Sequence, residues 1–173
     1  MVIGGTFRDV AIRSASTHDI DVVIVDTDRM DGEAMRAEGF APVPGSPHAW
    51  RYRHRGRTVD LEIAAIASST AAQGPFSVAF QQARTARIEG VRVRVPTVED
   101  WVILKLLAAA ADARRRARDL ADVQWTLQAY PERVATTLSV AAIRGRLRRL
   151  YGLAGERLRD VVALLRAVPR AGK

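Results

Sequence analysis

The sequence predicts an α+β protein, in which a mixed β-sheet with flanking helices is followed by a C-terminal α-helical bundle. The residue pattern differs between the two parts of the 173-residue chain, and this difference supports the prediction. Residues 1–96 alternate short β-branched runs with turn signals, whereas residues 97–173 carry apolar side chains at helical spacing. We therefore expect two regions, 1–96 and 97–173, with the helical region packed on the first.

The strongest strand signal is residues 19–25, because a nearly unbroken β-branched run is typical of a central strand covered on both faces. A hairpin should follow later, since two strand-like runs flank Arg55-Gly56. The expected elements of this region, in chain order, are strand 19–25, helix 31–38 ended by Gly39, loop 42–47, strands 49–54 and 58–66, helix 75–84, and strands 86–89 and 91–95 turning at Gly90.

The helical region should begin at Thr97. Its hydroxyl suits an N-cap, and Glu99 and Asp100 place acids in the first turn, where the helix dipole favours them. Apolar side chains then recur at helical spacing as far as Leu127. Residues 132–167 predict two more amphipathic helices, separated near Gly152.

Composition excludes several kinds of site. The chain has no cysteine, so it has no disulfide, no thiolate zinc site and no cysteine nucleophile, and its three scattered histidines argue against a histidine-built metal site. No apolar stretch approaches the roughly 18–20 residues of a membrane span, and the first residues do not resemble a signal peptide. We expect a cytoplasmic protein.

The net charge is +8, and only Lys105 and Lys173 are lysines. This arginine richness either reflects the base composition of the genome or attracts a polyanion such as nucleotide, RNA or an acidic protein. Charge alone does not separate these possibilities.

The strongest candidates for functional residues are two pairs of acidic side chains. Asp19 and Asp21 stand two residues apart in a predicted strand, so both carboxylates leave the same face. Adjacent carboxylates repel each other unless a cation lies between them, and oxygen ligands suit Mg²⁺. Asp60 and Glu62 repeat the spacing, and a neighbouring strand would bring one of them to the same ions. Three carboxylates around two divalent ions suffice for phosphoryl transfer.

A glycine pair precedes these acids, in the segment Gly-Gly-Thr-Phe-Arg-Asp at residues 4–9. Together with Asp19-Ile-Asp21, this head resembles class II tRNA nucleotidyltransferases within the superfamily that shares a polymerase β-like palm. The continuation is more similar to small stand-alone nucleotidyltransferases, including minimal antitoxins and abortive-infection-type toxins. It has Val-Arg-Val-Pro at 93–96, a helix lysine, and Arg116-Ala-Arg-Asp-Leu-Ala-Asp122. The resemblance covers about residues 2–128 and implies a nucleotidyltransferase palm over residues 1–96.

The resemblance also implies roles for individual residues. Asp19, Asp21 and Asp60 would be the catalytic metal ligands, with Glu62 as the rival of Asp60. The residues that would contact the nucleotide are Gly4, Gly5, Arg8, Thr17 and Lys105. Glu62, Asp119 and Asp122 would contact the acceptor or support the site. The resemblance also implies a break between two helices near residues 113–117.

Simpler interpretations remain open for several of these residues. Arg8 would otherwise pair with Asp9 or Glu33, and Lys105 would face solvent. The fold should then tolerate loss of Lys105, because its neighbours are leucines. Asp119 would pair with Arg115, four residues earlier, or with Arg116, three residues earlier.

The predicted function is transfer of a nucleoside monophosphate from an NTP to an acceptor hydroxyl. Two Mg²⁺ ions are expected as cofactors, with Mn²⁺ able to replace them. The acceptor would be a tRNA end, a protein partner of the toxin–antitoxin type, or a small molecule of the aminoglycoside class. A catalytically inactive module that binds nucleotide or RNA is the alternative.

Overall fold

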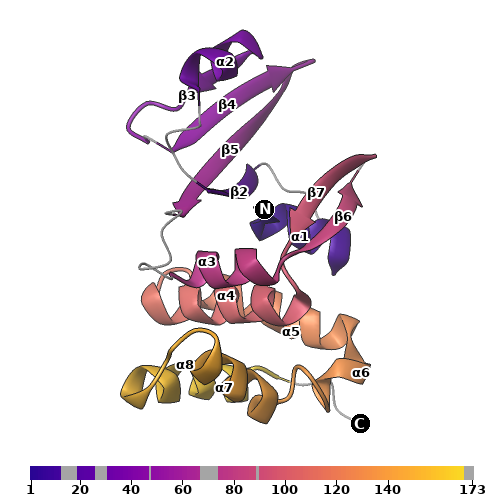
Figure 1. Cartoon of the computed structure of the whole chain (residues 1–173), viewed down its shortest axis with the longest axis vertical. Helices are drawn as coiled ribbons and strands as arrows, with labels where there is room; N and C mark the ends of the chain where they lie inside the picture. Colours follow the sequence, from indigo (N-terminus) through magenta and orange to yellow (C-terminus); the bar gives the residue numbers. More distant parts are fainter. Residues whose placement is uncertain (13–18, 26–30, 47, 67–73, 89, 170–173) are drawn as a thin grey trace. The chain divides into compact units, whose positions relative to one another are not determined.

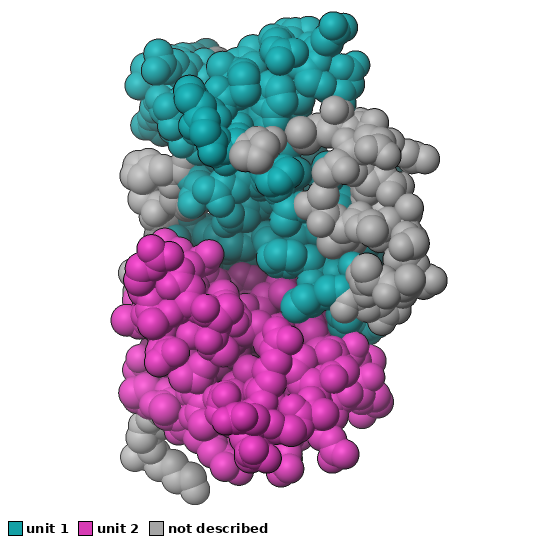
Figure 2. Space-filling view, turned by 90° about the vertical axis from the view of Figure 1, so that its left-hand side faces the viewer, with its two compact units in different colours: residues 1–95 teal, residues 96–173 magenta. Residues whose placement is uncertain are grey.

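The computed structural model describes residues 1–12, 19–25, 31–46, 48–66, 74–88 and 90–169. The chain separates into two compact units, Met1–Val95 and Pro96–Lys173 (Figure 2).

The first unit is built mainly of strands (Figure 1). Its elements are β1 (Val2–Ile3), α1 (Gly4–Ala11), β2 (Asp19–Val25), α2 (Gly32–Ala37), β3 (Phe40–Pro42), β4 (Ala49–His54), β5 (Arg57–Ile66), α3 (Pro75–Gln82), β6 (Arg84–Ile88) and β7 (Val91–Val95). Five strands form one sheet in the order β1-β2-β5-β4-β3, and β6 pairs with β7 in a second sheet. Among the described strands of the larger sheet, β2 and β5 pair in parallel and the other neighbours pair antiparallel, so this sheet is mixed.

The β4–β5 hairpin turns where the sequence predicts. Its two loop residues, Arg55 (φ 49°) and Gly56 (φ 75°), both have positive φ, and His54 pairs with Arg57 across them. Two positive φ angles in a two-residue loop are the requirement of a type I′ turn, which matches the twist of the flanking strands. The turn therefore fixes the register of β4 against β5.

The glycine pair begins a helix, which the sequence did not predict. Gly4 takes a positive φ of 61° and starts α1, an amphipathic helix whose Phe7 is 1% exposed. Glycine is a poor helix former, so helix propensity alone predicts a turn at the glycine pair and not the start of a helix. Burial of Phe7 supplies the tertiary contact that favours the helix.

The second unit is helical, with α4 (Val98–Ala111) at its centre. The other helices are α5 (Arg116–Ala129), α6 (Pro131–Val134), α7 (Val140–Arg149) and α8 (Gly155–Ala167). Helix α4 buries side chains around most of its circumference and contacts α5, α7 and α8. As predicted, Thr97 is its N-cap and accepts a hydrogen bond from the Asp100 backbone N–H at 3.1 Å.

The break between α4 and α5 lies at residues 112–115, without glycine or proline. The Asp112 carboxylate accepts the Arg114 backbone N–H at 2.9 Å, which is an Asx turn. This side chain offers the backbone a partner outside the helix and so ends α4.

The fold is therefore α+β with a mixed sheet, and this confirms the predicted class. Within the described residues, no helix is both long enough and apolar enough to cross a membrane.

Candidate active site

Four carboxylates share one face of the larger sheet. In the parallel β2–β5 pair, Asp19 is opposite Asp60 and Asp21 is opposite Glu62. Partners in a parallel pair project to the same side, as do residues two apart on one strand. Both acidic pairs therefore leave the same face, with neighbouring strands roughly 4.8 Å apart. The sequence predicted each pair, and the register unites them.

An arginine from the next strand holds Asp60. Arg51 is opposite Asp60 in the β4–β5 hairpin and donates two hydrogen bonds, from Nε to Oδ1 at 2.7 Å and from Nη2 to Oδ2 at 2.8 Å. These hydrogen bonds lower the pKa of Asp60 and raise that of Arg51. We did not predict this pairing, although counting back from the two-residue turn places Arg51 opposite Asp60.

The carboxylates on this face are suitable ligands for a divalent metal ion. Carboxylate oxygens are the ligands that Mg²⁺ prefers, and Asp19, Asp21 and Asp60 share a side of the sheet. In the arrangement seen here, both Asp60 oxygens face Arg51, and across the described ranges no three acidic or histidine side chains converge as a metal site. Asp60 would have to exchange Arg51 for the ion to join Asp19 and Asp21.

Gly4 leaves room for the Asp21 carboxylate. A Cβ at Gly4 would lie 1.6 Å from Asp21 Oδ2 and 2.5 Å from Asp21 Cγ. The carboxylate thus lies against the first residue of α1, where the helix dipole favours negative charge. Glycine at position 4 accordingly has a second physical reason, close approach of a carboxylate, beside the predicted approach of a phosphate.

Gly4→Ala should therefore displace Asp21 as well as strain the backbone. A left-handed residue other than glycine costs roughly 1–2 kcal/mol, and the steric conflict adds to that loss. Gly45→Ala is the matched control, because Gly45 also has positive φ (77°) but no atom within 4 Å of the added Cβ. Urea denaturation should show the larger loss for Gly4→Ala; equal losses would contradict the close contact.

The remaining predicted nucleotide contacts have different surroundings. Gly5 lies in the first turn of α1. Arg8 pairs with its neighbour Asp9, at 3.0 Å from Nη2 to Oδ1, which is one of the two ion pairs considered for it. Thr17 lies outside the described residues.

Lys105, Asp119 and Asp122 come together inside the second unit. Lys105 Nζ lies 3.0 Å from Asp119 Oδ1 and 2.6 Å from Asp122 Oδ2. The lysine side chain is 13% exposed, and the two carboxylates are 0% and 2% exposed. The 112–115 turn folds α5 back on α4 and closes this cluster. Arg115 adds a weaker contact, 3.6 Å from Asp119 Oδ2, from a half-exposed position.

This cluster changes two expectations. Lys105 does not face solvent as a lone helix residue, because its ammonium forms ion pairs with two buried carboxylates. For the same reason the fold should not be indifferent to its loss: removal would leave buried charge uncompensated. Its predicted phosphate contact stays a prediction that this pairing does not support.

A second buried cluster, a hydrogen-bond network around Asp100, was not predicted from the sequence. The Asp100 carboxylate is fully buried and accepts hydrogen bonds from Arg146 Nε (2.8 Å) and Nη2 (2.6 Å), Tyr151 Oη (2.8 Å) and Thr97 Oγ1 (2.6 Å). Burial, and then the charge of Asp100, raises the pKa of Tyr151. The partners are 46 and 51 residues away in sequence, so no local pattern reveals them. The network anchors α7 and the following turn to the start of α4.

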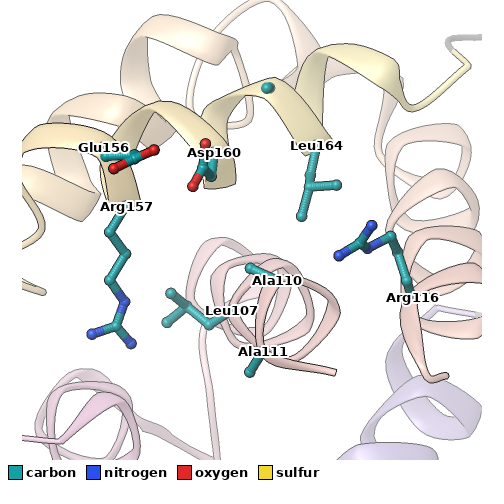
Figure 3. A pocket seen from close by; sticks show the side chains of 9 residues that line it. Leu107, Ala110, Ala111, Arg116, Glu156, Arg157, Asp160 and Leu164 are labelled. Atoms are coloured by element: carbon teal, nitrogen blue, oxygen red, sulfur yellow. The ribbon is translucent and has the colours of Figure 1, made fainter. Parts of the chain in front are cut away.

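The second unit also has an open pocket of about 570 Å³ between α4, α5 and α8 (Figure 3). Its lining residues are Leu107, Ala110, Ala111, Arg116, Glu156, Arg157, Asp160, Ala163 and Leu164. Figure 3 shows Arg116 extending from α5 on one side of the pocket and Arg157 from α8 on the other, with Glu156 and Asp160 on the same side as Arg157. The charges are mixed, and none of the residues predicted to bind metal or nucleotide lines this pocket.

Comparisons with known proteins agree with the fold. Residues 6–162 match the family described as uncharacterised nucleotidyltransferases. The structure is similar to that of an antigenic nucleotidyltransferase-like protein from Paracoccidioides brasiliensis, with 18% identity, a TM-score of 0.53, and coverage of 98% of this chain and 85% of that one. No curated protein shows significant similarity. Because the family match spans most of its length, the chain belongs to the uncharacterised nucleotidyltransferase family.

Proposed function

We propose that the chain is a nucleotidyltransferase that moves a nucleoside monophosphate from an NTP to an acceptor hydroxyl. One observation carries the proposal: the parallel register that gathers Asp19, Asp21 and Asp60 on one sheet face beside the start of α1. The family match supports the reaction class.

In the proposed reaction the acceptor oxygen forms a bond to the α-phosphorus, and the bond from that phosphorus to the bridging oxygen breaks. Pyrophosphate leaves, and the hydroxyl proton passes to solvent. Magnesium, held by Asp19 and Asp21 with Asp60, would acidify the hydroxyl and neutralise phosphate charge. Gly4 and Gly5 would leave the α1 backbone open to the phosphates. Arg51 would stabilise Asp60 whenever the ion is absent.

Proposed candidates for the acceptor are an RNA end such as that of tRNA, a protein partner of the toxin–antitoxin type, or an aminoglycoside-like small molecule. An inactive nucleotide-binding module of the same fold is the competing proposal. The pairing of Asp60 with Arg51 is compatible both with an active enzyme and with an inactive module, so it favours neither proposal.

The test is pyrophosphate release from each NTP, with Mg²⁺ or Mn²⁺ and with RNA, protein and aminoglycoside acceptors. Asp19→Asn with Asp21→Asn should reduce turnover about a thousandfold, or roughly 4 kcal/mol of barrier. The same variant should lose Mn²⁺ binding in calorimetry. Glu33→Gln with Glu38→Gln removes two exposed carboxylates of the same unit and should change neither. Wild-type protein that binds NTP but releases no pyrophosphate with any acceptor would be the inactive module.

A further inference from the structure

The β6–β7 hairpin is unusually basic. Its sequence contains Arg84, Arg87, Arg92 and Arg94 and a single acid, Glu89. The two strands form a sheet of their own, so one ribbon carries all four arginines.

The register sorts the ribbon into two faces. Arg87 is directly opposite Arg92, and Thr85 is opposite Arg94. Because antiparallel partners project to the same side, these four residues share one face, which we call the basic face. The other face carries Arg84 opposite Val95, together with the apolar pairs Ala86–Val93 and Ile88–Val91.

Like charges directly across a strand pair are destabilising, and the hydrogen bonds of these arginines within the described residues go to backbone carbonyl oxygens. Arg94 donates to the carbonyl oxygens of Phe80 (2.8 Å) and Ala83 (3.3 Å), and Arg87 donates to that of Gly90 (3.1 Å). In the part of the chain that the structure describes, no carboxylate forms an ion pair with any of the four arginines. All four residues of the basic face are exposed.

The ribbon also has a defined place in the first unit. Strand β7 contacts β1, and β1 pairs with β2 through Ile3 opposite Asp21. A polyanion bound to the ribbon would thus lie near the β1 edge of the larger sheet. Strand β1 is next to β2, which carries Asp19 and Asp21.

We propose that the basic face binds the phosphate backbone of RNA, which would make the acceptor an RNA chain. Arginine forks bind phosphate oxygens in bidentate geometry, and residues two apart on a strand set charges about 7 Å apart along the ribbon. A protein partner would need an apolar centre, whereas this face has only arginines and Thr85. The Thr85 hydroxyl is a neutral partner for a 2′-hydroxyl, the group that distinguishes RNA from DNA.

The experiment measures binding of a fluorescent single-stranded RNA without NTP or metal ion. Arg87→Gln with Arg92→Gln should weaken binding at least about tenfold and reduce the slope of log affinity against log salt by about 1.4, as expected for two lost phosphate contacts. Arg148→Gln with Arg159→Gln is the matched control, because it removes the same charge from exposed positions in the second unit. It should weaken binding less than threefold.

Equal losses in the two pairs would overturn the proposal in favour of diffuse charge attraction. Polyglutamate that competes as well as RNA at equal charge would overturn it in favour of an acidic protein, and DNA of the same sequence that competes equally would overturn the RNA assignment. If the double variant is less stable than wild type, Arg92→Gln alone gives the same test, with about half the change in slope.

The proposal rests on the proposed function for the role of RNA as acceptor, but the binding assay does not require turnover. The Asp19→Asn, Asp21→Asn variant should still bind RNA. Transfer that fails while RNA binding follows the prediction would remove only the proposed reaction.

Discussion

Replacing Lys105 with methionine should lower the free energy of unfolding of the helical unit by about 3 kcal/mol or more. The substitution keeps the length of the side chain but removes a positive charge that lies within 3.0 Å of both Asp119 and Asp122. Both carboxylates are buried, so each would lack its closest counter-charge away from water. Urea denaturation followed by far-ultraviolet circular dichroism measures the change.

The control for this experiment is Arg115→Gln. Arg115 contacts Asp119 at 3.6 Å but is 51% exposed, and surface ion pairs contribute less than about 1 kcal/mol. Adding Asp119→Asn and Asp122→Asn to the Lys105→Met variant should recover part of the lost free energy of unfolding, because these substitutions remove the buried negative charges that have lost their lysine partner. A Lys105→Met protein within 0.5 kcal/mol of wild type would show that the cluster is not a buried ion pair in solution.

Arg146→Met should have a loss of similar size, about 3–5 kcal/mol. The variant takes two hydrogen bonds from Asp100, which is 0% exposed, and detaches α7 from the start of α4. Arg149→Met, at an exposed position of the same helix, should change stability by less than about 0.5 kcal/mol. Similar losses for the two arginines would mean that helix propensity, and not the Asp100 network, determines the effect.

The same network predicts a loss of stability in alkali. Burial and Asp100 raise the pKa of Tyr151 above its ordinary value of 10.0, so the folded state holds the phenol proton more tightly than the unfolded state. Stability is then complete below pH 10 and falls as pH rises above it. Tyr151→Phe should remove this part of the alkaline slope, at a cost of about 1–2 kcal/mol at neutral pH.

Local patterns in the sequence predicted most strands and helices, because apolar spacing and turn residues are local signals. The β-branched run at 19–25 and the Arg55-Gly56 turn are both found where expected. The glycine pair was misjudged, since tertiary burial of Phe7 outweighs the low helix propensity of glycine.

The candidate site was predictable only in part. Two acidic pairs at i, i+2 follow from strand periodicity, but the parallel register that joins them connects strands 41 residues apart and leaves no local trace. The pairing of Lys105 depends on an Asx turn at Asp112, and the Asp100 network on side chains more than 40 residues away. Such contacts arise from the assembled fold.

The type I′ turn of the β4–β5 hairpin has an evolutionary consequence. Asp60 is the fourth residue after Gly56, so the number of residues between turn and carboxylate decides which side of the sheet the acid occupies. A single-residue insertion or deletion there would exchange Asp60 and Glu62 for their apolar neighbours and move the acids to the opposite side. Functional relatives should therefore conserve the parity of this short segment, and differ in its length only by even numbers or by a compensating β-bulge.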